Sequence, residues 1–139
     1  MTTPADQAVS KRALWTGRTL STLVVLFLLF DSITKIMKEP HVIAASAQLG
    51  FSAGKIVGIG VILLVCTILY SIPRTAILGA ILLTGYLGGA VEVQYHIGNP
   101  IFETVFPVIF SSLAWLGIYV REPRLRALVP LRTPRTTGV

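Results

Sequence analysis

Two pairs of ionisable residues, each four positions apart, stand inside or at the ends of apolar stretches of this 139-residue chain. The first pair is Asp31 with Lys35 and the second is Glu92 with His96. A spacing of four residues puts both members of a pair on one face of a helix. An ionisable group at the centre of a membrane span costs about 2.5–3.5 kcal/mol, so such groups indicate a functional site. Carboxylic acids, a histidine and an ammonium group around one pocket would support proton transfer.

The helical rise places these groups at one depth in a membrane. Asp31 lies thirteen residues after Arg18, and Glu92 lies eighteen residues after Arg74. At ~1.5 Å per residue these separations are roughly 20 Å and 27 Å, so both carboxylates are predicted in the outer half of the bilayer. Glu103 opens the last apolar stretch at the same level.

We therefore expect Asp31 and Glu92 to act as acid and base, with His96 as a proton partner and Lys35 as an electrostatic stabiliser. The residues expected to bind substrate are Gln94, Tyr95, Glu103 and Gln48. No metal site and no organic cofactor is expected. The alternative is that Asp31 and Lys35 form a local ion pair whose lysine extends toward the interface, and that the other groups are solvated residues at helix ends.

The elements that must position these residues are membrane spans. The chain is 53% hydrophobic and only 13% charged, where a soluble domain carries about a quarter charged residues. Its apolar stretches approach the ~20 residues that cross ~30 Å of hydrocarbon. Spans are predicted at about 19–36, 54–72, 75–96 and 101–120, with a short interfacial helix within 40–51 and a basic tail over 121–139. The prediction is one all-α domain over 1–139, an integral membrane four-helix bundle.

Glycines suggest which face of the third span packs inward. Gly85 and Gly89 form a GxxxG pair, and their face continues toward Glu92 and His96. Small residues allow helix backbones to approach closely in membranes. We therefore expect close helix packing at Gly85 and Gly89 that directs Glu92 and His96 into the bundle.

The basic residues predict orientation rather than nucleic-acid binding. Of twelve Lys and Arg residues, nine lie before the first span, beside the short turn after the second span, or in the tail: Lys11, Arg12, Arg18, Arg74, Arg121, Arg124, Arg126, Arg132 and Arg135. Positive residues collect on the cytoplasmic side, so both termini are predicted there, with the 37–53 and 97–100 loops outside. The net charge of +6 would then face anionic lipid, and no aromatic-rich basic face indicates nucleic acid.

The chain resembles the DoxX-like family of small four-helix bacterial membrane proteins. The resemblance rests on the stretches 30–35, 44–51, 70–75, 78–90 and 121–126, of which the most specific is 83–90, LTGYLGGA. It implies a four-helix bundle in the bacterial cytoplasmic membrane. Named relatives are associated with thiosulfate:quinone oxidoreductase subunits and with oxidative-stress complexes, so quinone is implied by resemblance alone.

One departure from the family pattern bears on function. After the Gly-Gly-Ala block, family members commonly read Ala-Thr-His-x-Arg. Here Gln94 stands at the usual histidine position and His96 at the usual arginine position, and Glu92 is an added acid. The departure weakens a quinone role and favours a specialised member.

Three functions are consistent with the sequence. The one we favour is an enzyme that performs acid/base chemistry, such as isomerisation, epoxide opening or cyclisation, on a small lipophilic substrate. The second is a non-catalytic subunit that supports a redox partner protein, and a homodimer is a further expected form of assembly. The third is a small-molecule binding or transport module, for which the inverted repeats or broken helices of transporters are not seen.

Overall fold

The computed structural model describes residues 10–129, and every regular element in this range is a helix. In chain order the elements are α1 (Lys11–Ile36), α2 (Pro40–Gln48), α3 (Ala53–Ser71), α4 (Ala76–His96), α5 (Ile101–Arg121) and α6 (Pro123–Leu128). The expected tail beyond residue 129 lies outside the described residues.

Four of these helices, α1, α3, α4 and α5, are long and apolar enough to cross a membrane. Helices α3, α4 and α5 begin and end within one residue of the expected bounds 54–72, 75–96 and 101–120. The first helix begins at Lys11 rather than near residue 19, because Ser10 caps it by accepting a hydrogen bond from the Ala13 N–H at 3.2 Å. The predicted span is therefore the C-terminal part of a 26-residue helix, and polar residues are concentrated in the first turns of that helix.

Short helices and turns connect the spans. Glu39 caps α2, its carboxylate accepting from the Val42 N–H at 3.0 Å, and Pro40 occupies the first turn. Helix α4 ends before Gly98, whose φ of 74° suits glycine best. Pro100 itself is the N-cap residue of α5, with non-helical backbone angles.

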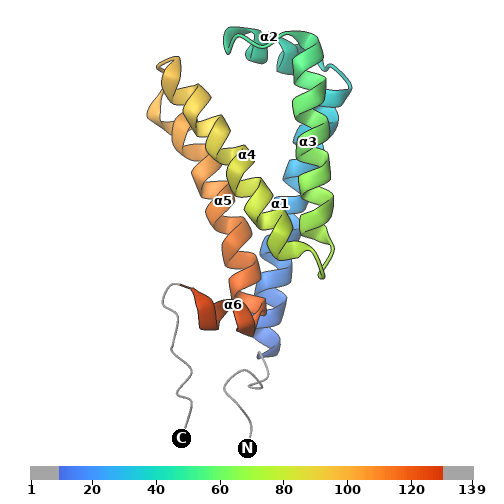
Figure 1. Ribbon diagram of the computed structural model, residues 1–139, viewed down its shortest axis with the longest axis vertical. Coiled ribbons are helices and arrows are strands. Elements are labelled where there is room, and N and C mark those ends of the chain that lie inside the picture. The colour runs from blue at the N-terminus through green and yellow to red at the C-terminus, as the bar shows by residue number, and fades with distance from the viewer. Residues whose placement is uncertain (1–9, 130–139) are drawn as a thin grey trace, which may run out of the picture.

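The long helices are closely packed at one end of the bundle and spread at the other (Figure 1). Helix α1 packs against α3 and α5, and α4 packs against α5 and α3. Toward the end where α2 lies, α4 and α5 lean away from α1 and α3. The beginning of α1 and helix α6 lie at the opposite end.

The closely packed end is held by a buried tyrosine and by backbone approaches at glycine. The Tyr70 hydroxyl donates to the Ala114 carbonyl at 2.7 Å and is hydrogen-bonded to Ser21 Oγ at 3.0 Å, joining α1, α3 and α5. A Cβ added at Gly79 would lie 2.2 Å from the backbone nitrogen of Tyr70, which shows how tightly α3 and α4 meet beside their turn.

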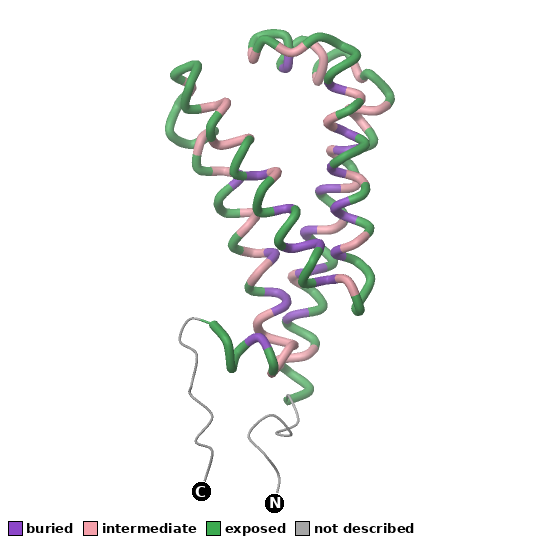
Figure 2. Tube along the Cα trace, viewed as in Figure 1, coloured by how far each residue is buried: buried purple, intermediate pink, exposed green. Residues whose placement is uncertain are grey.

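The outward faces of the long helices are apolar. Leu23, Leu26, Phe30 and Ile62 are each more than half exposed, and buried positions follow the inner faces (Figure 2). A surface of this kind suits lipid and not water. The structure is that of a multi-pass, all-helical membrane protein.

The expected packing at Gly85 and Gly89 is wrong for this chain. A Cβ added at either position would meet nothing within 4 Å, and both glycines are exposed. The GxxxG spacing predicts a close approach only if that face meets another helix, and here it meets open space. The close approaches involve glycines outside that motif, such as Gly17 with Gly117.

Candidate functional site

A cavity of about 520 Å³ opens where the helices spread, and all four long helices contribute to its wall. The loop after α2 contributes Leu49 and Phe51, and α2 itself contributes the buried Ser46. The volume lies within the range of roughly 300–1,000 Å³ that is typical of small-molecule sites. The cavity is therefore large enough for a small organic ligand.

Helix α1 places an ion pair in this wall. Asp31 and Lys35 both line the cavity, and the Lys35 ammonium is paired with the Asp31 carboxylate one turn away. The side chain of Lys35 is 17% exposed and that of Asp31 is 33% exposed. The pair is thus partly desolvated, which strengthens its attraction compared with a surface pair.

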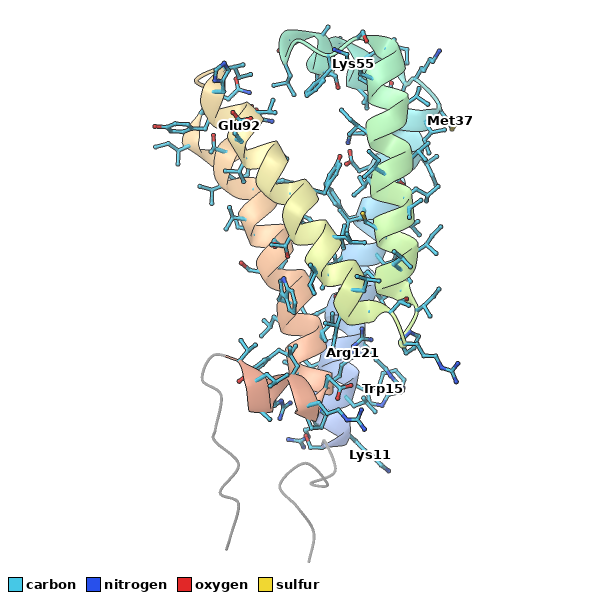
Figure 3. The ribbon with its side chains drawn as sticks, in the orientation of Figure 1. Lys11, Trp15, Met37, Lys55, Glu92 and Arg121 are labelled. Atoms are coloured by element: carbon cyan, nitrogen blue, oxygen red, sulfur yellow. The ribbon has the colours of Figure 1, made fainter. Side chains whose placement is uncertain are left out.

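Helix α4 places a second carboxylate and an amide in the same wall. Glu92 and Gln94 line the cavity, and Glu92 lies near the spread end of α4 (Figure 3). Among residues 10–129, Glu92 takes part in neither of the two ion pairs, which are Asp31 with Lys35 and Glu39 with His41. The Gln94 carbonyl oxygen accepts from the side chain of Asn99, which ties the α4–α5 turn to the cavity rim.

The remaining expected site residues do not line the cavity. His96, Tyr95, Glu103 and Gln48 are all exposed, and Tyr95 is 78% exposed. Glu92 is exposed too, but it lines the cavity and these four residues do not. His96 is the last residue of α4, at the end that leans away from α1. The structure therefore brings together Asp31, Lys35, Glu92 and Gln94, but not His96 as their proton partner.

Aromatic rings form the apolar part of the wall. Phe27 of α1 stacks on Phe110 of α5 with ring centroids 4.3 Å apart, and Phe106 lies 4.9 Å from Phe110 and 5.9 Å from Phe27. All three rings line the cavity, as does Tyr86 of α4. Pro107, which lies inside α5 and is buried, also faces it. The cavity thus joins an aromatic wall to a charged region.

A comparison with protein families identifies the family of this chain. The sequence model of the DoxX-like family matches residues 19–117. The chain belongs to the DoxX-like family. Every residue that lines the cavity, from Phe27 to Phe110, falls within the matched segment of this DoxX-like chain. No curated protein and no solved structure matches it.

Sequence reasoning missed the aromatic wall and Tyr86. Phe106 and Phe110 are four residues apart and therefore share a helical face, but an aromatic face in a membrane helix equally suits lipid. Tyr86 lies within the 83–90 stretch that carried the family resemblance, and its polar hydroxyl inside an apolar span was the available signal. Ser46, in the short helix α2, gave no comparable signal.

Within the described range, no group of three His, Cys, Asp or Glu side chains is placed to hold a metal ion. The polar groups that line the cavity are carboxylates, an ammonium, an amide, a serine hydroxyl and a tyrosine hydroxyl. These groups exchange protons and donate or accept hydrogen bonds.

Proposed function

We propose that this DoxX-like protein is an enzyme that performs acid/base chemistry on a small lipophilic substrate within the bilayer. The observation that carries the proposal is the placement of Asp31, Lys35 and Glu92, from two different helices, in the wall of one cavity. Two carboxyl groups on opposite sides of a bound molecule can divide the removal and the donation of a proton between them.

The roles follow from what each side chain contacts. Asp31 and Glu92 are the acid and base, and Lys35 stabilises negative charge beside Asp31. Gln94 is a hydrogen-bonding residue for the substrate, because its carbonyl oxygen is already engaged by Asn99 and its amide N–H groups remain for a ligand. The rings of Phe27, Phe106 and Phe110 bind the apolar part of the substrate.

The aromatic wall supports a lipophilic substrate. Ligand sites are generally apolar with a few polar groups that fix orientation, and this cavity follows that pattern. Isomerisation, epoxide opening and cyclisation are the reaction types that need only a proton donor and a proton acceptor.

The membrane placement we propose is the bacterial inner membrane, with both ends of the chain in the cytoplasm. Lys11 and Arg121 lie at the closely packed end, and Glu92 lies at the spread end (Figure 3). Under the positive-inside rule the closely packed end faces the cytoplasm. The cavity would then open in the outer half of the membrane.

The test uses purified protein in lipid nanodiscs. A panel of lipophilic enones and epoxides is incubated with protein in D₂O, and deuterium incorporation and ring opening are followed by mass spectrometry. Asp31→Asn and Glu92→Gln should each remove most turnover, whereas Glu103→Gln, which changes an exposed glutamate outside the cavity, should leave it intact. Turnover that survives both cavity substitutions, or no turnover across the panel, would contradict the enzyme proposal. Either result would favour the alternative, a non-catalytic subunit that supports a redox partner.

A further inference from the structure

The charges in the cavity wall do not balance among the described residues. Two carboxylates, Asp31 and Glu92, face one ammonium, Lys35, and that ammonium is taken by Asp31. The other outer-end lysines, Lys38 and Lys55, are exposed and do not line the cavity. Glu92, an exposed residue, therefore lines the cavity without a salt bridge to a cation in residues 10–129.

The aromatic rings of the cavity wall can also attract a cation. The face of an aromatic ring is electron-rich and attracts a cation within about 6 Å, most strongly where water is excluded. Three phenylalanine rings and Tyr86 line the same cavity as Glu92. Phe27 and Phe110 stack at 26° with centroids 4.3 Å apart, and Phe106 lies 4.9 Å from Phe110 and 5.9 Å from Phe27, so the three rings form one aromatic cluster.

We propose that the cavity binds a lipophilic organic cation, an ammonium or a molecule that becomes cationic during reaction. Glu92 is its counter-ion and the phenylalanine rings cover its apolar groups. The inference rests on the proposed function, since it takes this cavity as the substrate site, and it adds the charge of the ligand.

A neutral ligand would leave the carboxylate of Glu92 without an ion partner in the cavity. Its polar atoms would compete for Lys35 and Gln94, but nothing in it would offset the charge of Glu92. A carboxylate ligand is excluded on the same grounds, because it would add a third negative charge to the cavity. A carboxylate with no salt bridge among residues 10–129, in the same cavity wall as several aromatic rings, favours a cationic ligand.

A matched pair of probes tests the proposal. Benzyltrimethylammonium and neopentylbenzene have nearly the same shape, and they differ in the charge of one central atom. Equilibrium binding of each is measured on the full chain in nanodiscs of zwitterionic lipid, with empty nanodiscs subtracted. We expect Glu92→Gln to weaken binding of the cation at least tenfold and to leave binding of neopentylbenzene unchanged.

Two further variants separate charge from shape. Glu92→Asp keeps the carboxylate and should retain most of the cation affinity, whereas Phe106→Leu keeps apolar bulk but removes a ring and should weaken the cation several-fold. Glu103→Gln is the matched control, with the same substitution on an exposed glutamate outside the cavity, and should change nothing.

The outcomes distinguish this inference from the proposed function. If both probes bind and Glu92→Gln affects neither, the cavity takes neutral ligands, the cation inference fails and the proposed enzyme stands. If neither probe binds the unchanged protein, the cavity is no ligand site and both proposals fail. Cation binding that is lost in Glu92→Gln but kept in Glu92→Asp and Glu103→Gln establishes the inference.

Discussion

Removal of the carboxylate charge of Asp31 should destabilise the fold by a measurable amount. The substitution Asp31→Asn keeps the shape of the side chain but leaves the ammonium of Lys35 without its partner. Breaking a fully buried ion pair costs about 3–5 kcal/mol, whereas an exposed pair contributes about 0.2–1 kcal/mol. Lys35 is 17% exposed and Asp31 is 33% exposed, so we expect a loss of about 1–3 kcal/mol.

The assay is thermal unfolding of the purified protein in a mild detergent. A loss of this size corresponds to a fall in Tm of roughly 3–10 °C for a chain of this length. The double substitution Asp31→Asn with Lys35→Met removes the unpaired ammonium as well and should recover most of the lost stability. Glu103→Gln is the control, because Glu103 is exposed and forms no ion pair among the described residues.

Two results would contradict a partly desolvated pair of Asp31 and Lys35. If Asp31→Asn shifts Tm no more than Glu103→Gln does, the pair is fully solvated and the cavity wall is wetter than its exposure indicates. If the double substitution is less stable than Asp31→Asn alone, the ammonium of Lys35 is held by something other than Asp31. Either result would remove the basis for a desolvated charged region in the cavity.

Three other predictions follow from the structure. Gly79→Ala should lower Tm by several degrees, because its Cβ would lie 2.2 Å from backbone, whereas Gly85→Ala meets open space and should leave Tm unchanged or raise it. A cysteine at Asn99 in a cysteine-free chain should react with an impermeant maleimide in intact cells, and failure to react there, with labelling of the C-terminal tail, would reverse the orientation. The hydrogen bond between Glu39 and His41 lowers the pKa of the glutamate below 4.5 and raises that of the histidine above 6.5. Protection of the first turn of α2 in hydrogen exchange should therefore be greatest between about pH 4.5 and 6.5. It should fall as the pH drops through the lowered pKa of Glu39, and also as the pH rises through the raised pKa of His41. A protection factor that does not change with pH would contradict this prediction.

Helix length and position could be predicted because few physical requirements set them. A span must be about 20 apolar residues long, and Pro40, Pro73 and Pro100 stand at or beside helix boundaries, where a proline disfavours continuation of the preceding helix. The same rise per residue predicts one depth for Asp31 and Glu92, and both residues line one cavity in the structure. Depth along a helix depends only on counting residues.

The rotation of each helix about its own axis could not be predicted in the same way. The GxxxG rule selects a tight face by side-chain size alone, and at Gly85 and Gly89 the face with small residues meets no helix. His96 is four residues from Glu92, but α4 ends there and leans away from α1, so one more turn takes it out of the cavity. Packing between helices far apart in sequence decides these angles, and no local pattern encodes it.

The two ends of the bundle differ in how closely their helices pack. At the closely packed end, Tyr70 is buried and hydrogen-bonded across three helices, and Gly79 lets α4 touch the backbone of α3. Those contacts do not involve the cavity, so they hold the helices together while α4 and α5 spread at the other end. Charged groups in a membrane destabilise the helix that carries them unless something offsets the cost. A firmly joined opposite end offsets part of that cost, and under our proposal it allows Glu92 to line the cavity and to be available to a ligand.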